Sequence, residues 1–91
     1  MNHCMDNEAV KNRLKRIEGQ VRGLMKMVEE DKSCEEIIIQ IGSAKSALHK
    51  TGQVILEGHL QHCILDGIRE GNEEETIKNL SSAIEQFSRI S

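Results

Sequence analysis

Two cysteines and one histidine are the residues of this chain best suited to bind a soft metal ion or to react as thiols. His59 precedes Cys63 by four residues in the stretch GHLQHC, and Cys34 lies 25 residues before His59 in the stretch SCEE. Residues four apart share one face of an α-helix, so the imidazole of His59 and the thiol of Cys63 could hold one ion together. These side chains could also be buried core residues or a redox pair. The helices or strands on which they lie decide between these interpretations.

Apolar residues recur every three or four positions along most of the chain, which is the period of an amphipathic helix. This pattern predicts one helix from about 6 to 30, a second, unusually long helix from 33 to 71, and a third from 72 to 90. The chain has no proline, and its apolar residues are mainly Ile, Leu, Val, Met and Ala, with Phe87 as the single aromatic residue. Such a mixture suits helices better than strands. The sequence therefore predicts an all-α fold of three helices.

Two capping-box patterns mark the expected starts of the second and third helices. Ser33 is followed three residues later by Glu36, and Asn72 is followed by Glu75. In such a box the first side chain accepts a hydrogen bond from a backbone amide of the first turn, while the acid reaches back to the cap. With Ser33 as the cap, Cys34 becomes the first residue of its helix. The helix dipole and the free amides there favour a thiolate, which suits ligation or reactivity.

Length and composition limit the class of protein. A chain of 91 residues is expected to form one domain over residues 1–91, with 1–5 as a flexible tail. So short a chain buries only somewhat over ~60% of its unfolded surface, and it is therefore expected to form an oligomer. No apolar run approaches the ~20 residues of a membrane span, and the N-terminus lacks the apolar core of a signal peptide, which predicts a cytoplasmic protein. Three cysteines in such a compartment favour metal binding or reactivity over a disulfide framework.

The predicted long helix keeps Cys34 and His59 apart within one chain. At a rise of ~1.5 Å per residue they are separated by roughly 38 Å, which is beyond the reach of a shared ligand. Two copies of this helix packed antiparallel would instead bring Cys34 of one chain beside His59 and Cys63 of the other, giving two equivalent sites per dimer. Alone, a helical cysteine is usually a small buried hydrophobe and a helical histidine is usually solvated. Ordinary packing, however, would not require His59 and Cys63 to share a helix face, or Cys34 to meet them in an antiparallel pair. The three residues together therefore favour a common site.

The net charge of −3 conceals a strong charge gradient along the chain. Over residues 11–26 six basic residues face the single acid Glu18, a net charge of +5, whereas over residues 66–85 six acids oppose two basic residues, a net charge of −4. The basic first helix could bind nucleic acid, and Lys45 and Lys50 could extend its basic face. A charge run is usually a solvated face, and no helix-turn-helix, zinc-finger or aromatic stacking pattern is present. Charge alone therefore leaves DNA binding undecided.

A family resemblance covers nearly the whole chain. It rests on the segment NRLKRIEGQVRG at residues 12–23, on Cys34 at the start of the second helix with Gln40-Ile41 after it, and on His59 and Cys63. With these residues the chain resembles the family of copper-sensitive operon repressors. The resemblance implies an all-helical, antiparallel four-helix-bundle dimer with a third helix appended, paired into a dimer of dimers. It also implies that the protein represses a promoter by binding double-stranded operator DNA and releases that DNA when its ligand binds.

The copper pattern of this family falls on Cys34 of one subunit and on His59 and Cys63 of the other. Two thiolates and one imidazole suit a soft Cu(I) ion in a three-coordinate site. The family also includes nickel/cobalt, persulfide and formaldehyde sensors, and a fourth ligand, for which His3 is the candidate, would suit Ni(II). Cu(I) is therefore the expected inducer and Ni(II) the alternative.

Several positions keep the identity of the inducer open. The chain has Ser33 where a tyrosine can occur in the copper sensors, and Asn79 where a glutamate can occur. Cys4 could replace His3 as the fourth ligand, or both residues could belong to the flexible tail. A persulfide sensor needs the two cysteines but no histidine, and a formaldehyde sensor does not need the second cysteine. A complete Cys-His-Cys set therefore favours a metal.

The resemblance also assigns the basic residues to DNA. Arg13, Lys15, Arg16 and Lys50 are the expected contacts, made largely to phosphates, and Arg13 comes first because it lies in the family-like segment. Two other classes compete with a repressor: a copper-storage or carrier protein that uses the same thiols without DNA, and a thiol enzyme. The basic first helix favours the repressor over the carrier. The enzyme is the weakest of the three because no second acid-base set accompanies the thiols and the chain offers little room for a substrate pocket.

Overall fold

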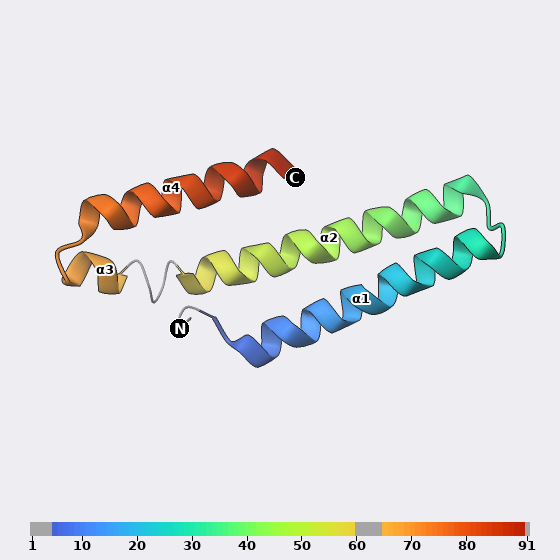
Figure 1. Ribbon diagram of the computed structural model, residues 1–91, viewed down its shortest axis with the longest axis horizontal. Coiled ribbons are helices and arrows are strands. Elements are labelled where there is room, and N and C mark those ends of the chain that lie inside the picture. Colours follow the sequence, from blue (N-terminus) through green and yellow to red (C-terminus); the bar gives the residue numbers. More distant parts are fainter. Residues whose placement is uncertain (1–4, 60–64, 91) are drawn as a thin grey trace. The chain divides into compact units, whose positions relative to one another are not determined.

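The structure, a computed structural model, describes residues 5–59 and 65–90 of the chain, and this part consists of helices and turns without a strand. It contains four helices in the described residues, α1 (Asn7–Glu29), α2 (Cys34–Gly58), α3 (Leu65–Arg69) and α4 (Glu73–Ile90), which are labelled in Figure 1. The all-α prediction is confirmed. The chain divides into two compact units that meet in sequence between Thr51 and Gly52, and each is described by itself.

The prediction of three helices was wrong. The single helix expected from 33 to 71 is present as two elements, because α2 ends at Gly58 and α3 begins at Leu65. Glycine weakens a helix by about 1 kcal/mol relative to alanine, and His59, which follows Gly58, adopts a wider π-type turn. The apolar repeat continues across this point in the sequence, so periodicity alone gave no sign of the division. The predicted tail at residues 1–5 lies, apart from Met5, outside the described residues.

The turn between α1 and α2 is fixed by backbone hydrogen bonds. The amide of Lys32 donates to the carbonyl oxygen of Met27 at 3.0 Å, and the amide of Asp31 donates to that of Val28 at 3.2 Å. This pattern closes a helix with one left-handed residue, and Asp31 takes that role with φ of 54°. The amide of Glu36 then donates to the hydroxyl oxygen of Ser33 at 3.2 Å, so the predicted serine cap of α2 is confirmed.

The turn between α3 and α4 repeats this arrangement with a glycine. The amide of Asn72 donates to the carbonyl oxygen of Gly67 at 2.9 Å, the amide of Gly71 donates to that of Ile68 at 3.1 Å, and Gly71 has φ of 82°. The amide of Thr76 donates to the carbonyl oxygen of Asn72 at 2.9 Å, which begins α4 where the second capping pattern predicted a helix. Glycine suits this left-handed position because it has no Cβ.

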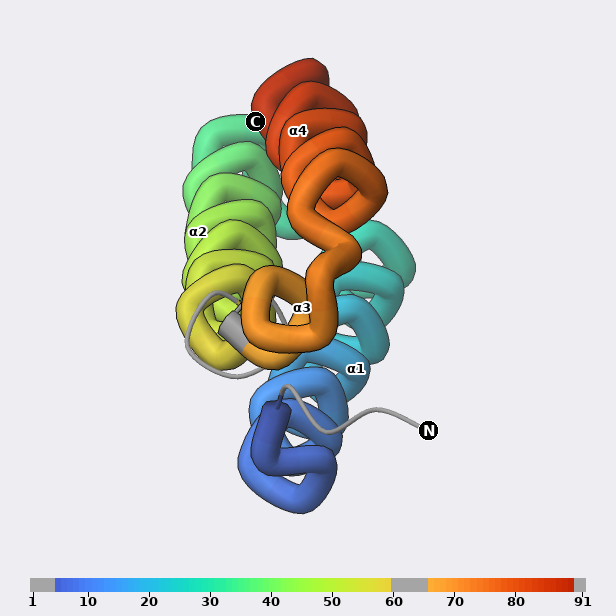
Figure 2. The backbone as a smooth tube through the Cα atoms, turned by 90° about the vertical axis from the view of Figure 1, so that its left-hand side faces the viewer, coloured from blue at the N-terminus to red at the C-terminus, as the bar shows by residue number. Residues whose placement is uncertain are grey.

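The first unit, residues 7–51, is an antiparallel hairpin of α1 and the first part of α2. The two helices lie side by side in both views (Figures 1 and 2). The side chains buried between them are Val10 and Ile17 of α1 and Ala44 and Thr51 of α2. The hydroxyl of Thr51 donates to the carbonyl oxygen of Ala47 at 2.8 Å, which satisfies this polar group in the interior. Two of these four side chains are small, so the core of the hairpin is thin.

A second apolar surface of the hairpin is exposed. It is formed by large side chains of both helices, each between 44% and 66% exposed, which we call the apolar side: Leu14, Val21, Met25, Val28, Ile38, Ile41 and Leu48. These residues recur at helical spacing next to the buried ones, so they continue the core outward on one side. Apolar patches of this kind mark contact surfaces in soluble proteins.

In the second unit, Phe87 of α4 packs against Gly52 of α2. A Cβ atom built on Gly52 would lie 2.9 Å from Cζ and 3.3 Å from Cδ1 of the Phe87 ring, both shorter than an ordinary van der Waals contact. Glycine is therefore needed at this position for the approach of the ring. The single aromatic residue of the chain thus joins α4 to the C-terminal part of α2.

We predict that Gly52→Ala destabilises the protein by about 1–3 kcal/mol, the usual cost of inserting a methyl group into a filled contact. Gly42→Ala is the matched control, because it lies in the same helix and a Cβ there would meet nothing within 4 Å. That change should stabilise by up to ~1 kcal/mol through helix propensity. Urea unfolding at one fixed protein concentration measures both free energies. Equal effects of the two substitutions would contradict the packing of Phe87 on Gly52.

Candidate functional site

The structure places two of the predicted metal ligands at the two ends of α2. Cys34 is the first residue of this helix and is exposed, and His59 directly follows its last residue, Gly58, and is half-buried. The other predicted ligands, Cys63 and His3, lie outside the described residues. Among residues 5–59 and 65–90, no group of three His, Cys, Asp or Glu side chains is arranged to hold a metal ion.

The length of α2 explains why Cys34 and His59 do not share a site within one chain. The helix is continuous over 25 residues, and at ~1.5 Å per residue its ends are roughly 37 Å apart. The hydroxyl of Ser33, the residue before Cys34, accepts a hydrogen bond from the amide of Glu36 and caps this end of the helix. A thiol in this position is accessible to a ligand that arrives from outside the chain.

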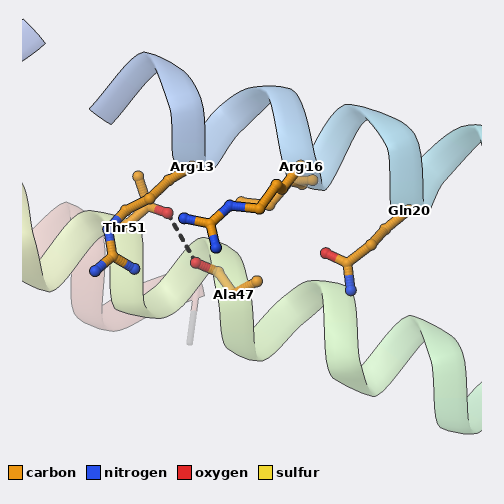
Figure 3. Close-up of a pocket in the computed structure, with 6 residues that line it drawn as sticks. Arg13, Arg16, Gln20, Ala47 and Thr51 are labelled. Carbon is orange, nitrogen blue, oxygen red and sulfur yellow. Dashed lines mark hydrogen bonds between the residues drawn. The ribbon is translucent and has the colours of Figure 1, made fainter. Parts of the chain in front are cut away.

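A groove on the hairpin brings together two of the predicted DNA contacts. Arg13, Arg16, Ile17 and Gln20 of α1 and Ala47 and Thr51 of α2 line a volume of about 360 Å³. In Figure 3 the side chains of Arg13, Arg16 and Gln20 extend from α1 toward α2. The residues 13, 16 and 20 are spaced by one and two helical turns, which puts them on the same side of α1. The groove is therefore basic along the α1 wall and neutral along the α2 wall.

The two arginines of the groove keep their charge available. Within residues 5–59 and 65–90 neither Arg13 nor Arg16 forms an ion pair, and no acid lines the groove. Arg22, by contrast, pairs with Glu18 at 3.1 Å on another side of α1. Both partners of that pair are largely exposed, so the pair contributes little to stability, but it partly neutralises Arg22. Arg13 and Arg16 thus place two positive charges, without an acidic partner among the described residues, where α1 meets α2.

The structure separates the other two predicted DNA contacts. Lys50 is exposed and follows Ala47 by three residues, so it lies on the groove side of α2, next to Thr51. Lys15 is exposed but does not line the groove. Successive helical residues turn by about 100°, so a residue two positions from Arg13 points to a different side of α1.

Gln20 is the groove residue that sequence reasoning missed. Its side-chain amide donates to the hydroxyl of Ser43 at 3.3 Å and links α1 to α2 across the groove. Its spacing from Arg13 and Arg16 was a usable signal, but a neutral glutamine in a charged segment does not stand out. The apolar side begins on the opposite flank of the buried residues, since Leu14 and Val21 follow Arg13 and Gln20 by one position. The hairpin is thus two-sided, with an apolar side and a basic groove.

Comparison with known proteins agrees with this arrangement. The family model described as metal-sensitive transcriptional repressor matches residues 6–86, which include α1, α2, α3 and most of α4. The chain belongs to this family. The family of repressors proposed from the residues is thereby confirmed, and the function is that of a metal-responsive transcriptional repressor.

Three relatives illustrate the range of this family. The chain is 38% identical to the copper-sensing transcriptional repressor CsoR of Bacillus subtilis over 91 residues, covering 98% of this chain and 90% of the relative. It is 46% identical to the copper-sensing repressor CsoR of Geobacillus thermodenitrificans, solved with Cu(I), with a TM-score of 0.86 over 89% of this chain and 84% of the other. It is 34% identical to the nickel-responsive transcriptional regulator InrS, with a TM-score of 0.82 over 96% and 98% of the two chains.

None of the helices in residues 5–59 and 65–90 has the length and apolar character that a membrane span requires. The matched segment contains the groove residues and the apolar side as well as Cys34 and His59.

We predict that Arg13→Ala weakens operator binding and lowers the slope of log affinity against log salt by about one, because one phosphate contact and its released counterion are lost. Lys15→Ala is the matched control, since it removes the same charge from α1 outside the groove. It should cost less affinity. Fluorescence anisotropy with labelled operator at several salt concentrations measures both variants. If the two substitutions weaken binding equally, the groove has no special part in DNA binding.

Proposed function

We propose that the protein is a Cu(I)-responsive repressor that holds double-stranded operator DNA through the basic groove and releases it when Cu(I) binds a site shared between subunits. The observation that carries the proposal is the 46% identity to a copper-sensing repressor solved with Cu(I), over 89% of this chain. The proposed metal ligands are Cys34 of one subunit and His59 and Cys63 of another. The proposed DNA contacts are Arg13 and Arg16 in the groove, Lys50 beside it, and Lys15 on the outer side of α1.

The chemistry of these donors fits a monovalent copper ion. Thiolate sulfur is a soft ligand that selects Cu(I), and one imidazole completes a three-coordinate set. Cys34 is exposed at the capped N-terminus of α2, where its thiol is accessible to a metal ion. The ion would supply the link between Cys34 of one chain and the end of α2 of another.

A dimer of antiparallel hairpins is the assembly that we propose for this site. The apolar side of each hairpin is exposed, and a second copy that covers it would complete a four-helix bundle. Antiparallel packing of two α2 helices sets the N-terminus of one beside the C-terminus of the other, which is where the three proposed ligands lie in the sequence. Two such dimers are proposed to pair into a tetramer, and the two grooves of each dimer then face DNA away from the apolar sides.

The proposed response follows from the position of the ligands at the ends of α2. A ligand can shift a two-state equilibrium only by its differential affinity for the two states. An ion that joins the N-terminus of one α2 to the C-terminus of another fixes their mutual register, and each α2 carries one wall of a groove. The DNA-bound arrangement of the grooves is proposed to be incompatible with that register.

The alternatives are an Ni(II)- or Co(II)-responsive repressor, a persulfide or aldehyde sensor of the same family, and a copper carrier without DNA. The similarity to a nickel-responsive regulator favours the first of these. Ni(II) prefers four ligands in a square-planar set, and His3 is the candidate for the fourth. A carrier would have no use for two arginines held without acidic partners in one groove.

We predict that mixing the Cys34→Ala and His59→Ala variants restores Cu(I) binding in a fraction of the dimers. In a mixed dimer, one of the two sites takes Cys34 from the His59→Ala chain and His59 and Cys63 from the Cys34→Ala chain, so it is complete. A dimer of either variant alone has no complete site. Competition with a Cu(I) chelator measures the recovered sites.

Labelled subunits in the same mixture provide the control for this experiment. They show by fluorescence transfer whether the chains exchange. Exchange without any recovery of sites would rule out a shared site.

We predict that removing residues 1–5 leaves Cu(I) affinity and Cu(I)-driven release of the operator nearly unchanged, because three ligands satisfy Cu(I) without the tail. Any Ni(II) response should fall, since His3 is lost. Cys34→Ala is the positive control and should abolish the Cu(I) response. A parent protein that responds to Ni(II) but not to Cu(I), and loses that response with the tail, would overturn the copper assignment.

A further inference from the structure

Gln20 combines three features that a purely structural polar residue does not need. It lines the basic groove together with Arg13 and Arg16, it is half-buried there, and its amide nitrogen donates to the hydroxyl of Ser43 at 3.3 Å. In Figure 3 its amide extends toward α2, beside the arginine side chains. Ser43 lies 23 residues away on the opposite helix, so the bond links the amide of Gln20 to α2.

The amide keeps hydrogen-bonding capacity for a ligand. A glutamine amide nitrogen carries two hydrogens and only one of them is used by Ser43. The two guanidinium groups beside it have several donors each and no acidic partner within the described residues. The groove therefore presents donors and positive charge without a carboxylate to compete for them.

A phosphate group is the ligand that fits this set of donors. Arginine binds phosphate through paired, charge-assisted hydrogen bonds, and a neutral amide can add one further bond to a phosphate oxygen. Ile17 and Ala47, the apolar residues of the groove, offer no acceptor side chain. A DNA phosphodiester and free inorganic phosphate share this chemistry, and the charge around the groove favours DNA because Lys50 adds a cation beside it.

We propose that Gln20 is a neutral hydrogen-bond donor to the operator phosphate that Arg13 and Arg16 bind, and that Ser43 positions it. This inference rests on the proposed function and deepens it by adding a contact without charge. Such a contact contributes to affinity but releases no counterion, so its loss changes the binding constant and leaves the salt dependence intact. Lower affinity with an unchanged salt dependence would distinguish the loss of Gln20 from the loss of any arginine or lysine of the interface.

The test compares operator affinity at several salt concentrations for Gln20→Ala, Ser43→Ala and Gln40→Ala. Gln20→Ala should lose about tenfold, which corresponds to one hydrogen bond to a charged group, with an unchanged salt slope. Ser43→Ala should lose less, because the amide stays but is no longer held. Gln40→Ala is the matched control, since Gln40 is an exposed glutamine of α2 outside the groove, and its affinity should equal that of the parent.

A further variant keeps the test decisive if Gln20→Ala does not fold. Gln20→Glu is nearly isosteric and introduces a carboxylate beside two arginines, so it should weaken binding more than Gln20→Ala does. Cu(I) affinity and helical content should match the parent in each variant. An affinity equal to that of the parent for both Gln20 variants would overturn the inference.

Two further outcomes distinguish this inference from the proposed function. If the parent binds operator and Arg13→Ala weakens it while Gln20→Ala does not, only the role of Gln20 is wrong. If the parent binds no operator at any salt concentration, the proposed function fails as well. Inorganic phosphate that binds the parent but not Gln20→Ala, and does not displace operator from the parent at constant ionic strength, would assign the groove to free phosphate and overturn the DNA contact.

Discussion

The apolar surface that one hairpin leaves uncovered is the constraint on which the rest of this protein depends. Only Val10, Ile17 and Ala44 are buried apolar residues among those described, while larger side chains such as Ile38 are 66% exposed. Burial of apolar surface is the main favourable term in folding, at roughly 25 cal/mol per Å². We therefore propose that a chain this small gains stability by association over the apolar side. The basic groove lies on the other flank of the same two helices, so in the proposed assembly association and DNA binding use different residues.

The same arrangement gives a physical reason for a site divided between subunits. A continuous α2 of 25 residues keeps Cys34 far from the residues that follow Gly58. The ends of such a helix can be joined only by a second chain, and pairing over the apolar side is what would supply that chain. In the proposed mechanism the ion therefore fixes the position of one hairpin relative to the other, while DNA contacts the grooves of those hairpins.

Much of this could be predicted from the sequence where the signal is local. The cap at Ser33 and the helical period of α1 depend on neighbouring residues, and the structure confirms both. The division of the predicted long helix was missed because α2 ends at Gly58, next to the turn at His59, while the apolar repeat of the sequence continues. Gln20 was missed for a different reason, since its side chain is bonded to Ser43, which is 23 residues away. Side-chain types suggested the candidate ligands, but in the proposed site the position of Cys34 relative to the others depends on a second chain.

The central claim is that capture of a soft metal ion lowers the affinity of this repressor for its operator. The most direct measurement is the anisotropy of labelled operator bound by the parent protein, titrated in parallel with Cu(I), Ni(II) and a persulfide donor at one salt concentration. The account predicts release by Cu(I) that is complete near one ion per chain, with the operator still bound at the same ratio of Ni(II) or of the donor. Release by Ni(II) or by the donor, with no response to Cu(I), would contradict it.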